Sequence, residues 1–313
     1  MKIFIEIPTW LGDCVMSTPA IENIVKKYPN AKLTLFGSHI STETLKHHPN
    51  VEKIIVDTSK SKSFRIFHLI KKIKSFEKFD IAFSFRSSFA SKISLFFLKA
   101  ERKFQYNKKA FSGHQVQKYV SFVNKSLNIN FPAQDLKLYK PNNIKLSSKK
   151  LLGINPGATY GSAKRWYPKE FAKVSAYLSF QYDILIFGGP NEIDIANEIE
   201  EELKKLNVKN FKNIAGKTDI DKLIEYISSL SLFITNDSGP MHIAAAFKIP
   251  TIAIFGPTKA DETSPWMNEK ASILRKDLPC APCMKRVCPL KTHECMKSIS
   301  AEDVLKEIEK RKF

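Results

Sequence analysis

The first candidate for acid–base chemistry is Asp13, which follows Gly12 shortly after the apolar run of residues 2–8. The run suits a buried strand, and a helical pattern begins soon after the aspartate. A carboxylate at a helix N-terminus stays ionised, as a general base requires. An acid that only satisfies the free amides of a first helical turn would have the same position, so both roles remain open. The strand is not followed by G-x-G-x-x-G, so a dinucleotide-binding fingerprint is absent.

A second candidate site lies in the loop of residues 155–168, which combines two glycines, hydroxyl groups and adjacent cations. The loop follows an apolar run and precedes a helical pattern, which indicates a strand-to-helix connection. Flexible backbone, the hydroxyl of Thr159 and the charge of Lys164 are the components of a diphosphate cradle. A surface loop with incidental basic residues is the alternative.

Two further loops also follow predicted strands. In residues 188–192 the glycines let a ligand approach the backbone, and the Glu192 carboxylate can accept bonds from ribose hydroxyls or from helix amides. In residues 235–242 a tight polar turn leads into a helix whose first amides suit an anion. Asp237 or Ser238 can equally serve as the N-cap of that helix.

Four cysteines gather near the C-terminus in the pattern C-x2-C-x4-C-x6-C, with His293 among them; they are Cys280, Cys283, Cys288 and Cys295. Four thiols at this density can hold a structural zinc ion. The spacing differs from that of paired C-x2-C knuckles, so packed reduced thiols are the other interpretation. A fifth cysteine, Cys14, lies in an apolar helical pattern beside Asp13, which favours a core position over a nucleophile.

Alternating strand and helix patterns separate these loops and predict an α/β fold. In the first half the expected strands are residues 2–8, 31–36, 53–56 and 81–85, and the expected helices are 19–28 and 64–76. In the second half the expected strands are 151–155, 183–187, 211–214, 232–235 and 251–255, and the expected helices are 169–178, 192–206, 219–230 and 241–247. Pro168 suits a first helical turn, and a last helix is predicted to begin at Ser300, with Asp303 completing a variant capping box.

The polar stretch of residues 137–150 lacks periodicity and predicts a linker between two domains, residues 1–145 and residues 151–313. Each domain is long enough to bury its own core. The alternation predicts two Rossmann-like, doubly wound domains that face a central cleft. Ligands of such sheets bind beyond the carboxyl ends of the strands, where the four candidate loops are expected.

Basic residues exceed acidic ones: the 313 residues include fifty Lys and Arg and thirty-one Asp and Glu, a formal net charge of +19. Fifteen of these cations, but only three of the acids, lie between Lys60 and Lys118. The excess favours a polyanionic partner, namely a nucleic acid, an anionic membrane face or a phosphorylated ligand, and a solvated basic surface is the alternative. The sequence contains no zinc-finger pair and no ribonucleoprotein signature, so nucleic-acid binding is the less favoured class.

No apolar run reaches the ~18 residues that a membrane-spanning helix needs. Glu6 and Asp13 interrupt the apolar N-terminal segment, which argues against a signal peptide. The sequence therefore predicts a cytoplasmic protein, whose cysteines are thiols or metal ligands rather than disulfides.

Taken together, in this order and spacing, the four loops resemble those of the lipopolysaccharide heptosyltransferases, glycosyltransferase family 9. The similarity extends from residues 7–13 to residues 255–258. Residues 156–158 with 163–166, and residues 236–239 with 241–242, are most similar to the heptosyltransferase II group. The resemblance implies a GT-B fold, with the acceptor mainly on the N-terminal domain and ADP-heptose mainly on the C-terminal one.

The resemblance also implies residue roles. Asp13 matches the family's proposed base, Lys164 with Thr159 nearby matches the lysine that binds the donor phosphate, and Glu192 matches the residue that binds the nucleotide ribose. The turn that binds sugar and phosphate matches Asp237, Ser238 and Gly239, with His242 beside it.

The implied reaction moves heptose, with inversion, from ADP-L-glycero-D-manno-heptose to the first heptose of the lipopolysaccharide or lipooligosaccharide inner core. No Asp-x-Asp pattern lies near these loops, so we expect chemistry without a metal cofactor. The implied partners are a heptosyl-Kdo-lipid A acceptor and, transiently, the cytoplasmic face of the inner membrane, with no nucleic acid. A family member with another donor sugar or acceptor is the alternative.

Overall fold

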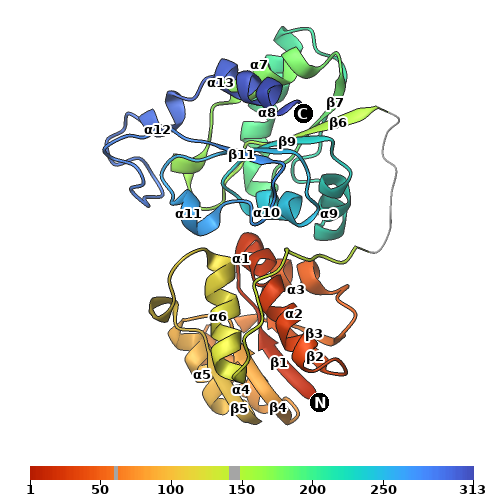
Figure 1. The fold of residues 1–313 in the computed structure, drawn as a ribbon, viewed down its shortest axis with the longest axis vertical. Helices are drawn as coiled ribbons and strands as arrows, with labels where there is room; N and C mark the ends of the chain where they lie inside the picture. Colours follow the sequence, from red (N-terminus) through yellow and green to blue (C-terminus); the bar gives the residue numbers. More distant parts are fainter. Residues whose placement is uncertain (60–62, 141–148) are drawn as a thin grey trace. The chain divides into compact units, whose positions relative to one another are not determined.

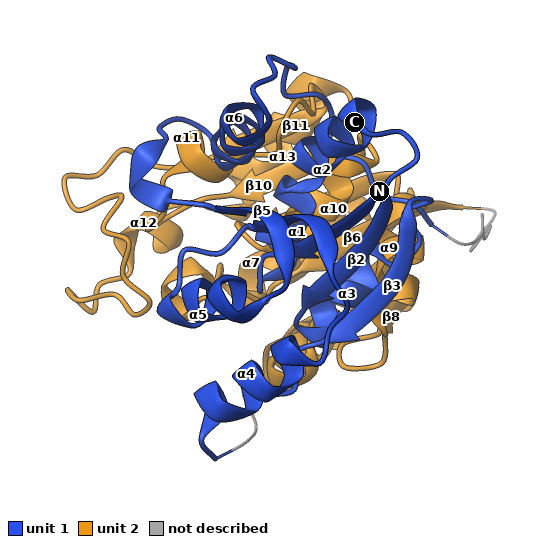
Figure 2. Cartoon of the chain, turned by 90° about the horizontal axis from the view of Figure 1, so that it is seen from below, with its two compact units in different colours: residues 1–141 blue, residues 142–313 orange. Residues whose placement is uncertain are grey.

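The computed structural model describes residues 1–59, 63–140 and 149–313 and contains two compact units, Met1–Pro141 and Asn142–Phe313 (Figure 1, Figure 2). Each unit is built on a parallel β-sheet, so the predicted α/β class is confirmed. Most of the predicted linker, residues 137–150, lies outside the described residues.

The sheet of the first unit has the order β3-β2-β1-β4-β5. Its central strand β1 buries Ile3, Phe4 and Ile5, because helices cover both faces of a parallel sheet. The strands are β1 (Lys2–Glu6), β2 (Lys32–Gly37), β3 (Val51–Val56), β4 (Phe79–Ser84) and β5 (Ala100–Gln105).

The helices of the first unit are α1 (Leu11–Met16), α2 (Thr18–Lys27), α3 (His39–Leu45), α4 (Arg65–Lys74), α5 (Phe89–Phe97) and α6 (Gln115–Leu127). Helices α4 and α5 lie side by side on one face of the sheet, where Leu69, Ile73 and Leu95 pack against Phe4. The predicted helices 19–28 and 64–76 correspond to α2 and α4. The helical pattern predicted at Asp13 corresponds to α1, whereas the sequence patterns did not predict α3, α5, β5 and α6.

The sheet of the second unit has the order β11-β10-β9-β6-β7-β8. Its strands are β6 (Lys150–Asn155), β7 (Tyr182–Ile186), β8 (Phe211–Asn213), β9 (Leu232–Asn236), β10 (Thr251–Ile254) and β11 (Ala271–Leu274). Its α-helices are α7 (Pro168–Leu178), α8 (Ile193–Lys205), α9 (Ile220–Ser228), α10 (Gly239–Ala246), α11 (Ala260–Thr263), α12 (Glu294–Lys297) and α13 (Ala301–Arg311). The nine strands and helices predicted from residue 151 to residue 255 are all present, with ends shifted by one or two residues at most positions.

Two predicted helix starts are confirmed in detail. Pro168 occupies the first position of α7, where its missing N–H removes no helical hydrogen bond. At the start of α13, the Ser300 hydroxyl accepts from the Asp303 N–H at 3.2 Å, and the Asp303 carboxylate accepts from the Ser300 N–H at 3.0 Å. This reciprocal pair is the predicted capping box.

Candidate functional site

The predicted diphosphate loop follows β6 and is fixed near both ends by Asn236, a fully buried residue at the end of β9. The Asn236 side chain donates to the Pro156 carbonyl oxygen at 2.7 Å and accepts from the Trp166 backbone N–H at 3.1 Å. The indole N–H of Trp166 donates to the Ile299 carbonyl oxygen at 2.8 Å. The segment that carries Lys164 is therefore held between two anchored points.

Lys164 and Asp237, predicted from separate loops, form an ion pair. The Lys164 ammonium donates to Asp237 Oδ2 at 2.5 Å and to the Asp237 carbonyl oxygen at 3.3 Å. The Thr258 hydroxyl donates to the same carboxylate oxygen at 2.6 Å. The two side chains of the pair are only 12% and 5% exposed. The structure thus brings together the loops that follow the adjacent strands β6, β9 and β10.

The turn between β9 and α10 places Ser238 at the N-cap and Gly239 at the first position of the helix. Ser238 is the N-cap by backbone position, but its side chain makes no capping bond to the helix. Its hydroxyl instead accepts from Asn155 Nδ2 at 3.1 Å and lies 3.2 Å from the Thr235 hydroxyl. His242 lies in the first half of α10, and its side chain is 3% exposed. The first backbone N–H groups of α10 therefore lie close to the Lys164–Asp237 pair, and the Ser238 side chain does not cap them.

Glu192 lies where the short helix Pro190–Glu192 meets α8, and it connects the loops after β6 and β7. Its Oε2 accepts from the Gly189 N–H at 2.8 Å, so the helix-stabilising role left open by the sequence is present. The same carboxylate lies against Gly157, where a Cβ atom would approach it to 2.1 Å. A side chain at this position would displace the Glu192 carboxylate, so Gly157 leaves the room that the carboxylate occupies at the carboxyl edge of the sheet.

Two cations surround the aromatic ring of Tyr160 in the diphosphate loop. The Lys164 ammonium lies 4.8 Å from the ring centroid and the Arg286 guanidinium lies 5.3 Å from it. The Tyr160 hydroxyl donates to the Met284 carbonyl oxygen at 2.6 Å, whereas the neighbouring Thr159 is exposed. The loop thus carries concentrated positive charge, which suits a phosphorylated ligand.

Asp13 lies in the first unit, in the first turn of α1 beyond β1, and is half-buried. Burial raises the pKa of the Cys14 thiol and of the Tyr119 hydroxyl, and the negative charge of Asp13 raises both further. Cys14 is fully buried, so its thiol stays protonated and the predicted core position is confirmed. Asp13 therefore lies near the buried side chains of Cys14 and Tyr119, while part of its own surface is exposed to solvent.

A buried polar network supports the backbone that leads to Asp13. Glu6, at the end of β1, accepts from the Ser84 hydroxyl at 2.5 Å and lies 3.4 Å from the Arg86 guanidinium. Arg86 also donates to the Ile7 carbonyl oxygen at 2.7 Å. Burial raises the pKa of Glu6, while the Arg86 charge and the Ser84 hydroxyl act in the opposite direction. This network ties the ends of β1 and β4 together at the carboxyl edge.

The four C-terminal cysteines line one small cavity of about 20 Å³, together with His293. Cys295 is buried and Cys280 is exposed. Across residues 1–59, 63–140 and 149–313, no group of three or more His, Cys, Asp or Glu side chains is arranged to hold a metal ion. The zinc interpretation therefore finds no support in this geometry, and the cysteines lie here as free thiols.

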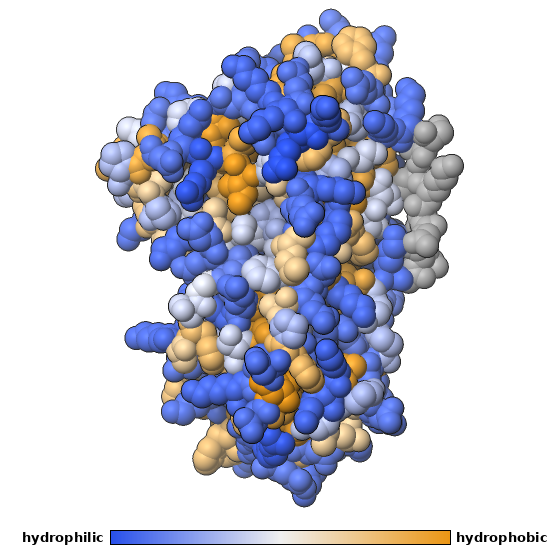
Figure 3. All heavy atoms as spheres, in the orientation of Figure 1, coloured by the Kyte–Doolittle hydropathy of each residue, from blue (hydrophilic) through white to orange (hydrophobic). Residues whose placement is uncertain are grey.

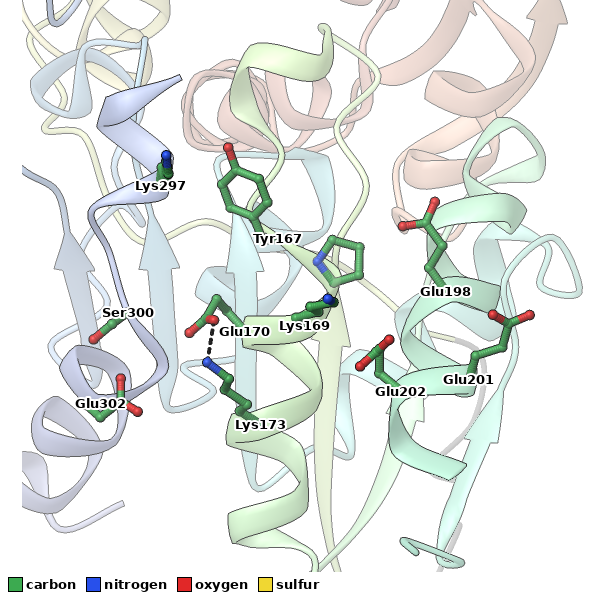
Figure 4. Close-up of a pocket in the computed structure, with 11 residues that line it drawn as sticks. Tyr167, Lys169, Glu170, Lys173, Glu198, Glu201, Glu202, Lys297, Ser300 and Glu302 are labelled. Carbon is green, nitrogen blue, oxygen red and sulfur yellow. Dashed lines mark hydrogen bonds and ion pairs between the residues drawn. The ribbon is translucent and has the colours of Figure 1, made fainter. Parts of the chain in front are cut away.

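A larger pocket of about 550 Å³ lies over α7, α8 and the start of α13 (Figure 4). It contains none of the predicted site residues. Its charged lining has five glutamates and three lysines, Glu170, Glu198, Glu201, Glu202, Glu302, Lys169, Lys173 and Lys297. An excess of carboxylates repels a diphosphate, so this pocket is not a candidate for the anion site.

Three residues of the site were given no role from the sequence. Thr258 lies in the loop after β10, so the rule that ligands bind beyond the carboxyl ends of strands also selects it. Asn236 stood within a predicted turn, but its contacts to Pro156 and Trp166 reach a different loop. Arg286 lies among the cysteines, where no local pattern indicates its approach to Tyr160.

Comparisons with known proteins identify the family of this chain. The family model of glycosyltransferase family 9 (heptosyltransferase) matches residues 76–294. A lipooligosaccharide heptosyltransferase 2 from Campylobacter jejuni is 46% identical over 314 residues, which cover 98% of this chain and 97% of the relative. A lipopolysaccharide heptosyltransferase 2 from Escherichia coli is 27% identical, with 88% of each chain covered.

Solved structures give the fold. The structure of E. coli ADP-heptose lps heptosyltransferase II matches with a TM-score of 0.81 and 24% identity, covering 99% of this chain and 98% of that one. A family 9 structure from Veillonella parvula matches with a TM-score of 0.80 and 20% identity, covering 99% and 96%. The two parallel-sheet units thus have the GT-B fold of these enzymes. The chain belongs to glycosyltransferase family 9, the heptosyltransferases, and is a glycosyltransferase.

Proposed function

We propose that this enzyme transfers heptose from ADP-L-glycero-D-manno-heptose to the first heptose of the lipopolysaccharide or lipooligosaccharide inner core, with inversion. The observation that carries the proposal is Lys164, fixed at the carboxyl edge of the second sheet beside the N-terminus of α10. A lysine and helix amides together suit a diphosphate. The 46% identical relative is named a lipooligosaccharide heptosyltransferase 2, which supports the donor and the acceptor.

In this proposal the second unit binds the donor. Two of the three N–H donors of the Lys164 ammonium are directed at Asp237, and the third meets a phosphate oxygen. Thr159 and Ser238 lie in the two loops that surround the diphosphate, Gly239 and His242 lie in α10, which follows the second loop, and Glu192 accepts from the ribose. Lys164 and the α10 amides stabilise the charge that develops on the departing ADP, a task that a divalent cation performs in other transferases. We therefore expect transfer to continue in EDTA.

The first unit binds the acceptor, and Asp13 acts as the general base. The acceptor hydroxyl oxygen attacks the anomeric carbon of the heptose while Asp13 takes its proton. The bond from that carbon to the phosphate oxygen breaks, ADP leaves with the electron pair, and one displacement inverts the configuration.

A product assay tests this proposal directly. The enzyme is incubated with ADP-heptose and with acceptors that end at Kdo, at the first heptose or at the second heptose, with and without EDTA. We expect one added heptose on the acceptor that ends at the first heptose, identified by mass spectrometry. Transfer only from another nucleotide sugar, or only to another acceptor, would replace the proposed substrates. Salt-sensitive binding to random DNA without ADP binding would favour the nucleic-acid class instead.

We also propose that the first unit contacts the anionic cytoplasmic face of the inner membrane, where a lipid A acceptor would lie. Leu69 and Ile73 of α4 pack against the sheet, but Phe64 and Phe67 are 85% and 67% exposed. On the adjacent helix α5, Phe89 and Phe96 are 75% and 76% exposed. Exposed aromatic rings among lysines are typical of an interfacial contact.

Exposed aromatic rings such as those of α4 and α5 stand out against the rest of the surface. The face in Figure 3 is mostly hydrophilic, with apolar side chains exposed in small groups. Within the described ranges, no helix has both the length and the apolarity to cross a bilayer. The predicted basic region includes residues 60–62, which lie outside the described residues, so the proposal uses only α4, α5 and their flanks.

Replacement of Lys71 and Lys92 by glutamine is expected to weaken binding to anionic vesicles by up to about thirtyfold, because each lysine near such a surface contributes about 1 kcal/mol at most. Phe64→Ser with Phe67→Ser should weaken binding at every salt concentration. Phe180→Ser, at an exposed ring of the second unit, is the control and should change nothing. Co-sedimentation with anionic and neutral vesicles at low and high salt measures these effects.

Equal binding to anionic and neutral vesicles, or binding that does not change with salt concentration, would reject the electrostatic contact.

A further inference from the structure

The residue before Lys164 is held by the segment that carries the cysteines. The Ala163 N–H donates to the Arg286 carbonyl oxygen at 3.0 Å, and the Ala163 carbonyl oxygen lies 2.9 Å from Nε2 of His293. Residues 280–296, here named the cysteine strap, thus bind both backbone polar groups of one residue. Ala163 is 3% exposed, so loss of these partners would leave buried polar groups unsatisfied.

The partners of His293 determine which ring nitrogen carries its proton. A carbonyl oxygen only accepts, so Nε2 of His293 carries the hydrogen donated to Ala163. In the neutral ring Nδ1 is then an acceptor, and the Tyr167 hydroxyl, 3.1 Å away, donates to it. Tyr167 is the N-cap of α7, at the end of the diphosphate loop. One imidazole ring therefore connects Ala163 to Tyr167 across Lys164.

The strap also fixes the loop that contacts the other member of the ion pair. The Met284 N–H donates to the Pro257 carbonyl oxygen at 2.8 Å. A Cβ atom at Gly256 would lie 2.4 Å from Met296 Sδ and 3.0 Å from Cys295 Sγ, so the strap packs directly on this backbone. Thr258, which follows Pro257, donates its hydroxyl hydrogen to the Asp237 carboxylate. The strap therefore supports the lysine and the carboxylate of the pair from two separate loops.

We infer that the cysteine strap positions the donor-binding loops and that His293 is a positioning residue that sets the place of Lys164. His293 acts through the Ala163 backbone and through Tyr167, while Lys164 makes the contact to the donor. The inference rests on the proposed function, because Lys164 is the proposed phosphate ligand.

His293→Phe keeps an aromatic ring and removes both hydrogen bonds. We expect the ADP dissociation constant to rise roughly tenfold, from two lost hydrogen bonds, with the KM for the acceptor unchanged. His293→Gln retains a donor and an acceptor and should stay within about threefold of the wild type. Isothermal titration with ADP and steady-state kinetics measure both, and thermal denaturation checks folding. If His293→Phe does not fold, Tyr167→Phe removes one hydrogen bond only and should still raise the constant by about threefold.

A double-mutant cycle separates positioning from general stability. In a Lys164→Ala background, His293→Phe should cause no further loss of ADP affinity, because the residue that it positions is gone. Additive losses, or folded His293→Phe protein with wild-type ADP affinity, would overturn the inference. If Lys164→Ala itself leaves ADP binding unchanged, the proposed donor site fails rather than the strap, so the two failures are distinguishable.

Discussion

Replacement of Asp13 by asparagine is expected to lower kcat about a hundredfold or more, because general-base catalysis typically contributes 10²–10⁴-fold. The amide has the size of the carboxylate but cannot take the proton of the acceptor hydroxyl. The dissociation constant for ADP should not change, since we propose that the donor binds to the other unit. Steady-state kinetics with ADP-heptose and a heptose-terminated acceptor, together with titration with ADP, give the two values.

Asp194→Asn is the matched control, because Asp194 is also an acid in the first turn of a helix, α8. A first-turn acid contributes about 0.3–1 kcal/mol to stability through the helix dipole. Both variants should therefore lose a similar, small free energy of unfolding, and only Asp13→Asn should lose turnover. If Asp13→Asn turns over at a near-normal rate, Asp13 has only the helix-stabilising role that its sequence position also allows.

Most strands of the second unit could be predicted because they are apolar runs followed by a polar or glycine-rich turn, as in β9, but the edge strand β11 was not predicted. The edge strand β5 could not, because its sequence AERKFQ exposes its charged side chains and has no apolar run. In α5 the helical pattern is hidden by Ser91 and Ser94, which are buried although they are polar. An apolar sequence pattern arises where a strand or helix is buried by its neighbours. Exposed edge strands, and helices whose buried face carries polar residues, lack this pattern and are hard to predict from sequence.

The candidate site could be predicted loop by loop, but not as a connected set. The rule that ligands bind beyond the carboxyl ends of strands selects Lys164 and Asp237 separately. Their ion pair joins residues 73 positions apart, and the bond from His293 to Ala163 joins residues 130 positions apart. The ion pair follows from the strand order β10-β9-β6, which an alternation of strands and helices does not specify, and the path of residues 280–296 back to Ala163 has no periodic pattern that predicts it.

Lys164→Ala is expected to raise the ADP dissociation constant about tenfold to hundredfold, because a charge-assisted hydrogen bond contributes about 1.5–3 kcal/mol. Lys164→Arg should restore part of the affinity, since the guanidinium keeps the charge but is planar and larger. Lys169→Ala, at an exposed lysine in the first turn of α7, is the control and should bind ADP normally. Isothermal titration with ADP measures all three.

Variants of Asp237, the partner of Lys164 in the ion pair, separate the effect of Lys164 on phosphate binding from its effect on stability. Lys164→Ala leaves the largely buried Asp237 carboxylate without its cation, so the variant should lose up to about 3–5 kcal/mol of stability, and the carboxylate should also repel the diphosphate. Asp237→Asn removes that repulsion, so with Lys164 intact it should bind ADP at least as tightly as the wild type. In Lys164→Ala the added Asp237→Asn should recover stability and part of the affinity. Equal ADP affinities in all four proteins, with only their melting temperatures changed, would reduce the pair to a structural contact and reject Lys164 as the phosphate ligand.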